Sequence, residues 1–276
     1  MNNVDTILLG IIQGLAEFLP ISSSGHLVLF QKLLGFREPE LLLDVVLHLG
    51  TLFSVCIYFR SDLKDMLKET WEFCRDLCRR QKGFRDVDDK PSAALTLMVV
   101  IGTIPTCLIG LAFQSQLERL FDSVTMVGFA LLTTGFILLI SRYIPENGKR
   151  KGKIILFTAL CIGAAQGFAI VPGISRSGTT IVCGMILGLR RELAARYSFL
   201  LSIPAIIGAM VVQLYAHELT GVIFLPLASG FLSAAIVGLI ALKIVMDMVK
   251  KGKLFFFSPY CWAIGLLAIG IGYMAG

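Results

Sequence analysis

Charged side chains are scarce in this chain of 276 residues. They make up 16% of it, against about 25% in a typical soluble domain. Hydrophobic residues make up 56%, and the mean hydropathy is +0.80. A soluble protein cannot bury this much apolar surface, so we expect a polytopic membrane protein. The net charge of +6 does not indicate a nucleic-acid partner, because the basic residues lie in short loops between apolar segments.

Several sequence patterns with known chemistry are also missing. There is no Walker A loop, no GxGxxG element and no zinc-type H-E-x-x-H, and residues 22–25 do not fit the G-x-S-x-G nucleophile elbow. These absences argue against nucleotide-driven chemistry and elbow-type hydrolysis. The seven cysteines form no disulfide or metal pattern, since most of them lie in apolar spans. Residues 4–20 lack a basic region and contain Glu17, so no cleavable signal peptide is expected.

Two stretches of the chain repeat each other, and each places a polar loop within apolar sequence. Residues 13–26 align without a gap with residues 166–179, and seven of the 14 aligned positions are identical. Roughly one match is expected by chance. Only the first copy holds Glu17, Ser23 and His26, and only the second holds Arg176. The sequence therefore predicts an active site assembled between two halves.

Six apolar segments are long enough to cross a bilayer as helices, which needs about 20 residues. They are 41–60, 91–113, 122–142, 193–215, 224–249 and 254–275. Two further apolar regions, 4–34 and 154–189, are interrupted by P-I-S-S-S-G and P-G-I-S-R-S-G. Non-helical backbone at membrane depth is tolerated only inside protein or beside a wet cavity. We therefore expect two re-entrant helix–loop–helix hairpins; the alternative is two short full spans in each region.

The expected fold is a single all-α integral membrane domain, 1–276, with an inverted-topology repeat. The repeats cover about 1–142 and 154–276, and each holds one re-entrant hairpin and three transmembrane helices. Because three is odd, the second repeat enters the membrane inverted, and the hairpin tips meet near the midplane. Most Lys and Arg residues then lie on one side, which predicts that this side is cytoplasmic and both termini are outside. Loop 60–90 is interpreted as a solvated helix pair without chemistry.

Arg176 is the most informative single residue, because a charge at membrane depth is expensive and usually functional. It stands among hydroxyls and a glycine at the start of an apolar helix, where backbone N–H groups favour anions. A guanidinium binds phosphate with two parallel hydrogen bonds. The pattern predicts a phosphate cradle; the alternative is an interfacial arginine followed by a helix cap. The substrate-binding residues expected here are Ser175, Ser177, Gly178 and Thr179.

The first loop repeats this cradle without the arginine. Ser22, Ser24 and Gly25 are expected to bind substrate, although three serines before a glycine can also cap a helix. His26 is a candidate for proton transfer or for attack on phosphorus, against the alternative of a structural histidine.

Glu17 lies in an otherwise apolar segment, one helical turn after Gln13. It is a candidate general base or divalent metal ligand, or a partner of Arg176 that holds the two hairpins together. Gln13 is the second metal candidate. His48 is a residue that can reach the site, whereas Asp44, Glu192 and Arg196 are interpreted as boundary residues.

These motifs resemble those of the bacterial undecaprenyl-diphosphate phosphatases, also called the bacitracin-resistance protein family. The resemblance rests on Q-G-L-A-E-F-L-P-I-S-S-S-G-H and P-G-I-S-R-S-G-T-T, and extends to the segments at 101–105 and 199–204. It implies hydrolysis of undecaprenyl diphosphate to the monophosphate, recycling of the carrier lipid for the cell wall, and bacitracin resistance. It further implies a divalent cation, Mg²⁺ or Ca²⁺, and a bacterial inner-membrane site open to the extracytoplasmic side. A homodimer is left open.

The expected mechanism has Arg176 hold the diphosphate while a nucleophile attacks the terminal phosphorus. Ser23, activated by Glu17 or His26, is the first choice, and His26 or a water positioned by it is the second. The competing class is a transporter of lipid or anions, because inverted repeats with broken helices are common in transporters. The group of Glu17, Ser23 and His26 opposite the arginine favours the enzyme.

Overall fold

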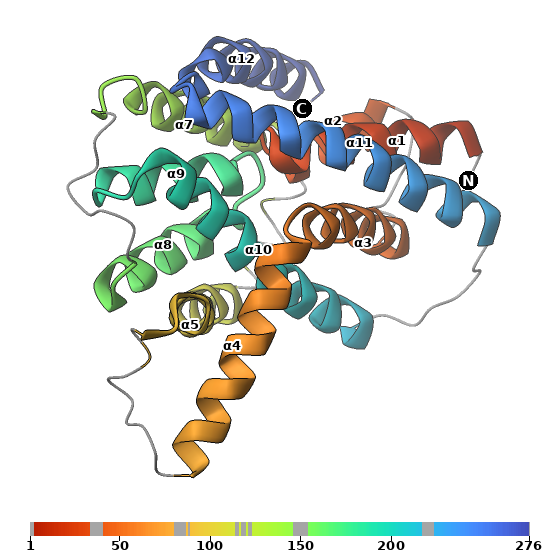
Figure 1. Ribbon diagram of the computed structural model, residues 1–276. Helices are drawn as coiled ribbons and strands as arrows, with labels where there is room; N and C mark the ends of the chain where they lie inside the picture. Colours follow the sequence, from red (N-terminus) through yellow and green to blue (C-terminus); the bar gives the residue numbers. More distant parts are fainter. Residues whose placement is uncertain are drawn as a thin grey trace.

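The computed structural model describes residues 3–33, 41–79, 87, 89–113, 116, 120, 123–145, 154–216 and 224–275, which are mostly helical (Figure 1). In chain order the helices are α1 (Asn3–Phe18), α2 (Ser23–Leu33), α3 (Leu41–Tyr58), α4 (Arg60–Cys78), α5 (Pro91–Ala112), α7 (Val124–Ile140), α8 (Leu156–Phe168), α9 (Arg176–Ile186), α10 (Arg191–Ala216), α11 (Phe224–Lys250), the 3₁₀ helix η2 (Leu254–Phe257) and α12 (Ser258–Ala275).

All six segments expected to span the membrane contain a long helix: α3, α5, α7, α10, α11 and α12. Four of these helices, α5, α10, α11 and α12, are each long and apolar enough to cross a membrane. α3 meets the length and hydropathy of a membrane span only when it is taken together with α4, and the two helices are bent by 75° from each other. α7 has 17 residues. At a rise of about 1.5 Å per residue it is about 26 Å long, short of the roughly 30 Å hydrocarbon core. The helical, multi-span character is thus confirmed, with fewer self-sufficient spans than predicted.

Both interrupted regions are helix–break–helix units. The break between α1 and α2 covers residues 19–22, and the break between α8 and α9 covers residues 169–175. Each break contains a proline, which cannot donate the next helical hydrogen bond. Each also contains a left-handed residue, Ser22 at φ 69° and Gly173 at φ 97°. These conformations turn the chain, so that the second helix of each unit starts in a new direction.

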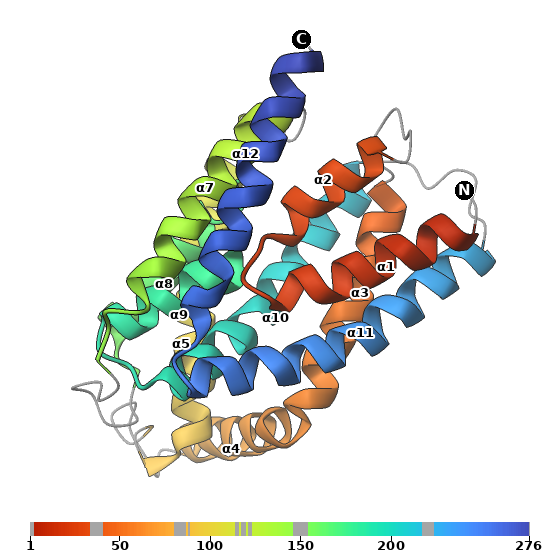
Figure 2. The same cartoon turned by 90° about the horizontal axis from the view of Figure 1, so that it is seen from above.

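The helices pack in a crossed pattern between the two halves of the chain. α1 lies along α11, α8 lies along α5, and α7 lies along α12 (Figures 1 and 2). Glycines allow the close approach of α1 and α8 to their partners. A Cβ atom on Gly10 would collide with Gly230 of α11, and one on Gly163 would collide with Gly102 of α5. Gly10 and Gly163 are separated by the same 153 positions as the two polar loops.

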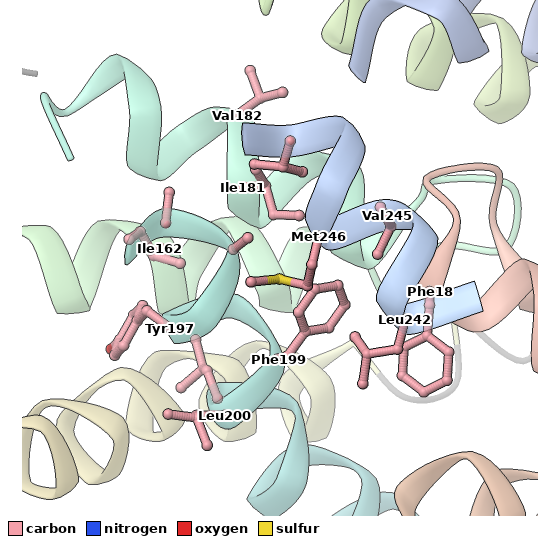
Figure 3. Packing of buried hydrophobic residues seen from close by; sticks show 14 of the residues in the cluster. Phe18, Ile162, Ile181, Val182, Tyr197, Phe199, Leu200, Leu242, Val245 and Met246 are labelled. Carbon is pink, nitrogen blue, oxygen red and sulfur yellow. The ribbon is translucent and has the colours of Figure 1, made fainter. Parts of the chain in front are cut away.

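The largest apolar core surrounds α10 and anchors the end of α1. Tyr197, Phe199 and Leu200 of α10 are almost fully buried, and Figure 3 shows them between α8, α9 and α11. Phe18, the last residue of α1, packs edge-on against Phe199, with ring centroids 5.8 Å apart. Because Phe18 directly follows Glu17, this packing fixes the place where the α1 carboxylate meets the breaks.

The first half of segment 60–90, which was expected to be a solvated helix pair, is a helix. Residues 60–78 form one helix, α4, and its Met66 and Phe73 side chains are buried. One side of α4 thus packs on the protein, which the alternating acids and bases of the sequence did not indicate. Most of the second half of the segment, 80–86 and 88, lies outside the described residues.

Candidate active site

The two breaks touch each other. Ser22 Oγ accepts hydrogen bonds from the backbone N–H of Gly173 at 3.1 Å and of Gly25 at 3.3 Å. In return, Ser177 Oγ donates to the carbonyl of Phe18 at 3.2 Å. Loops that lie about 150 residues apart in the chain are therefore bonded directly, as the duplicated motif predicted.

Ser22 holds a strained backbone at the centre of this contact. A positive φ at a residue other than glycine costs of order 1–3 kcal/mol and persists only when its surroundings impose it. Here the Ser22 carbonyl accepts from the backbone N–H of His26 at 3.2 Å and from the His26 ring at 2.8 Å. Together with the bonds to Gly25 and Gly173, these interactions fix the loop that leads into Ser23.

Glu17 is the centre of the polar cluster. Its Oε1 accepts from Arg176 Nη2, and its Oε2 accepts from Ser23 Oγ at 2.6 Å and Gln13 Nε2 at 3.0 Å. His48 Nε2 lies 3.9 Å from the same Oε2. The Glu17 side chain is only 4% exposed. A buried carboxylate is stable only when it is paired and hydrogen-bonded, and this one receives both forms of support.

Two helix N-termini converge on this cluster. Ser23 is the first residue of α2, and Arg176 is the first residue of α9. The opening N–H groups of a helix have no acceptor within the helix, and their dipole attracts negative charge. With the guanidinium of Arg176, which is 19% exposed, these termini create a region suited to an anion.

The α9 loop is fixed by a threonine from α7. Ser175 caps α9 by accepting from Gly178 N–H at 3.1 Å, and its own N–H donates to Thr134 Oγ1 at 3.0 Å. The Thr134 hydroxyl donates to the carbonyl of Gly173 at 2.8 Å. Thr134 was not predicted from sequence, because one threonine in an apolar helix carries no signal of its role.

His26 is turned toward α12. Its Nδ1 faces the Ser22 carbonyl, which can only accept, so Nδ1 carries the proton in the neutral ring. Nε2 then accepts from the Tyr260 hydroxyl at 2.8 Å, and the two rings are stacked 5.7 Å apart. Both ring nitrogens are thus engaged. Within the described contacts His26 does not bond to Ser23. Tyr260 is a second residue that sequence reasoning missed.

The remaining predicted binding residues fall into two groups. Most are used inside the loops: Ser22 and Ser24 lie 3.3 Å apart through their hydroxyls, as do Ser175 and Ser177. Gly25 and Gly178 have no room for a Cβ without crowding their neighbours, Gly173 and Leu138 respectively. Thr179 differs, because its Oγ1 is buried and has no hydrogen-bond partner among the described residues. Its hydroxyl is therefore suited to a ligand.

The donor set for a metal is small. The part of the chain that the structure describes holds no group of three His, Cys, Asp or Glu side chains suited to one ion. Gln13 Oε1, beside Glu17, is buried and without a partner there. One carboxylate and one amide oxygen match a weak Mg²⁺ site in which substrate phosphate supplies the other ligands.

The residues interpreted as boundary residues lie in contacts outside this cluster. Glu192 pairs with Lys250 at 3.1 Å, and Arg196 pairs with Asp62 of α4. Asp44 accepts from Gln31 at 2.7 Å, and its carbonyl faces His48 Nδ1 at 2.7 Å. His48 thus reaches the edge of the site, as expected, and Asp44 supports it.

Comparisons with known proteins agree with this picture. The chain matches the family described as "Bacitracin resistance protein BacA" over residues 6–267. It is 45% identical over 271 residues to a protein named undecaprenyl-diphosphatase from Desulfatibacillum aliphaticivorans, covering 96% of this chain and 97% of the relative. Proteins of the same name from Halothermothrix orenii and Methanobrevibacter smithii are 44% and 41% identical, again over at least 95% of both chains.

Proposed function

The chain belongs to the bacitracin resistance protein BacA family, and from this we propose that it hydrolyses undecaprenyl diphosphate to undecaprenyl phosphate and inorganic phosphate. The observation that carries the proposal is the joining of Ser23, Glu17 and Arg176 at the meeting point of two helix N-termini. This reaction returns the carrier lipid to cell-wall synthesis and underlies resistance to bacitracin in our proposal.

Arg176 holds the diphosphate in the proposed complex. A guanidinium has five N–H donors, so it can bind Glu17 and a phosphate at the same time. The N-termini of α2 and α9 add backbone donors, and the buried Thr179 hydroxyl adds one more. Donors fixed in advance and aimed at developing charge are the largest usual contribution to phosphoryl transfer.

Ser23 is the proposed nucleophile and Glu17 its base. Ser23 Oγ forms a bond to the terminal phosphorus while its proton passes to Glu17 Oε2, 2.6 Å away. The bond from that phosphorus to the bridging oxygen breaks, and undecaprenyl phosphate leaves with the proton that Glu17 has taken up. Glu17, ionised again, then takes a proton from water while the water oxygen bonds to the phosphorus of the phosphoserine. The bond between that phosphorus and Ser23 Oγ breaks, inorganic phosphate leaves, and the proton on Glu17 returns to Ser23 Oγ. His26 or a water positioned by it is the less favoured nucleophile, because Ser22 and Tyr260 engage both ring nitrogens.

A divalent cation fits beside these residues in a limited way. Gln13 Oε1 and the Glu17 carboxylate are the side-chain oxygens that would hold Mg²⁺ or Ca²⁺ together with the substrate. When bound, the ion would neutralise phosphate charge. Glu17 already receives three donors, so we expect such an ion to bind with the substrate rather than before it.

We also propose that the fold is an inverted-topology repeat with the basic loops in the cytoplasm and the site open to the extracytoplasmic side of a bacterial inner membrane. The packing of α1 on α11 and of α8 on α5 supports the repeat, because a two-fold axis that exchanges the halves would produce this pair of contacts. The equivalent glycines Gly10 and Gly163 at the two crossings support it further.

The test is phosphate release from undecaprenyl diphosphate by purified protein in detergent, with and without Mg²⁺ or Ca²⁺. We expect release by the unaltered protein and by Lys251→Ala, an exposed control, and its loss in Arg176→Ala and Ser23→Ala. Mass spectrometry after rapid quenching should find phosphate on Ser23. If folded, unaltered protein released no phosphate, the proposed phosphatase activity would be refuted. Transport of lipid or anions would then be measured in vesicles.

A further inference from the structure

The charges of α4 alternate along its sequence but separate around its axis. With about 100° per residue, the basic side chains fall in one sector and the acidic ones in the adjacent sector, about 100° further around the axis. The basic row consists of Arg60, Lys64, Lys68 and Arg75, all of them exposed, and Arg79 continues it. The acidic row consists of Asp62, Asp65, Glu69, Glu72 and Asp76. Two rows of opposite charge on one helix indicate two different neighbours.

Four of the five acids bind the protein itself. Glu69 Oε2 accepts from the backbone N–H groups of Ser92 and Ala93 at 2.7 and 3.2 Å and so caps α5. Lys90 Nζ lies 3.2 Å from Glu72 and 3.3 Å from Asp76. At the other end of α4, Asp62 pairs with Arg196 of α10. The acidic row therefore holds α4 against α5 and α10. In the basic row, Arg75 also lies 3.5 Å from Asp76, and Arg60, Lys64 and Lys68 are exposed.

An exposed apolar stripe runs beside the basic row. Leu67 and Trp71 are 75% and 74% exposed, and Cys74 and Cys78 continue the stripe at helical spacing. Met66 and Phe73, on the side of α4 opposite the basic row, are buried against the protein. A tryptophan beside lysines and arginines on an amphipathic helix is typical of helices that lie in a membrane interface.

The direction of α4 suits this location. α4 starts two residues after the end of α3 and is bent from it by 75°. If α3 crosses the bilayer, α4 runs nearly parallel to the membrane plane. Figure 2 shows α4 lying crosswise at the ends of α3 and α5, on the side where the basic C-terminus of α11 also lies.

We propose that the stripe Leu67–Trp71–Cys74–Cys78 and the adjacent basic row dock α4 onto an anionic lipid surface. The apolar side chains enter the boundary between headgroups and acyl chains, and Arg60, Lys64, Lys68 and Arg75 bind lipid phosphates. The positive charge of the basic row favours anionic lipid over a second copy of the chain as the partner of this surface. Two copies that met through this face would bring equal positive rows together, whereas anionic lipids complement them.

The experiment uses Trp71 as its own reporter. The chain has two tryptophans, so Trp262→Phe leaves Trp71 as the only one. The full-length protein is placed in nanodiscs of phosphatidylcholine alone or mixed with phosphatidylglycerol. Quenching of Trp71 by brominated lipid and by acrylamide is then measured. We expect brominated lipid to quench strongly, and acrylamide weakly, in the anionic discs.

Charge is tested with matched variants and salt. Lys64→Glu/Lys68→Glu should lose most of the lipid quenching, and Lys251→Glu/Lys253→Glu, exposed basic residues outside α4, should keep it. Raising salt from about 0.1 M to about 1 M shortens the Debye length from about 10 Å to about 3 Å and should weaken the quenching. An unchanged unfolding profile in detergent shows that each variant is folded.

Three results would overturn the proposal. Free access of acrylamide to Trp71 with no lipid quenching would place the stripe in water. Shielding of Trp71 from both quenchers, with Cys74 cross-links between chains, would identify a second copy as the occupant. Equal lipid quenching in neutral and anionic discs, unchanged by the lysine reversals, would remove the role of anionic lipid.

Discussion

Removal of the Arg176 guanidinium should destabilise the protein more than removal of the Glu17 charge. In Arg176→Met the Glu17 carboxylate, 4% exposed, stays buried with only the hydrogen bonds from Ser23 and Gln13. Breaking a buried ion pair from one side typically costs about 3–5 kcal/mol. Because two donors remain on Glu17, we expect a value near the lower end, about 3 kcal/mol.

Glu17→Gln should cost less, about 1–2 kcal/mol. The amide keeps a hydrogen-bonding group opposite Ser23 and Gln13, and the 19% exposed Arg176 side chain can turn its charge toward water. The double variant Glu17→Gln/Arg176→Met leaves no unpaired buried charge. We therefore expect it to be more stable than Arg176→Met alone, with a coupling energy of about 2–3 kcal/mol between the two positions.

The assay is unfolding in mixed micelles by a denaturing detergent, followed by fluorescence, beside phosphate release from the same samples. All three variants should have lost activity, while stability should fall only partly and recover in the double variant. Additive destabilisation in the double variant, or an Arg176→Met protein as stable as the parent, would refute the reasoning that the pair compensates two buried charges.

The other predictions concern residues around this pair. Ser23→Ala should lower kcat roughly a thousandfold or more with little change in unfolding, and Ser23→Cys should recover some activity if the side chain is the nucleophile; a fully active Ser23→Ala would assign attack to another group. Tyr260→Phe removes the hydrogen bond to His26 Nε2, which should cost about 1–2 kcal/mol. Because the strained Ser22 turn then loosens, we expect kcat to fall roughly 5–30-fold with KM unchanged. A variant with the same kcat and KM as the parent would limit Tyr260 to packing. Gly163→Ala should destabilise by about 1–3 kcal/mol because its Cβ meets the α5 backbone, whereas Gly208→Ala, with open space around it, should not; equal effects on unfolding would contradict the close α8–α5 crossing.

The helices were largely predictable because length and hydropathy act locally. The spans 91–113, 193–215, 224–249 and 254–275 each contain a helix within a few residues of the expected bounds. The pairing of α1 with α11 and of α8 with α5 was not predicted from the sequence. An apolar helix surface indicates that it is covered, but not by which partner. The glycines at 10 and 163 were not singled out in the sequence, and only the structure shows the close crossings that they allow.

The site was predictable where the duplication marked it. Glu17, Ser23 and Arg176 were expected to meet, and the structure bonds Glu17 to both others. Thr134 and Tyr260 gave no signal, since a threonine in an apolar helix and a tyrosine near the end of a span are ordinary in membrane proteins. Their roles arise from contacts across 41 and 234 positions, which no local pattern contains.

The two copies of the loop divide structure and chemistry between their identical and their differing positions. At the identical positions the same bonds recur. Ser22 and Ser175 each accept from the N–H of the glycine three residues later, and the Oγ of each lies 3.3 Å from the Oγ of the serine two residues later. At the differing positions, Ser23 of one copy corresponds to Arg176 of the other, and both bind Glu17. A symmetric pair of loops would place two arginines or two serines against each other. Divergence at these positions instead sets the Ser23 hydroxyl and the Glu17 carboxylate opposite the cation, which is the asymmetry that the proposed attack on a bound phosphate requires.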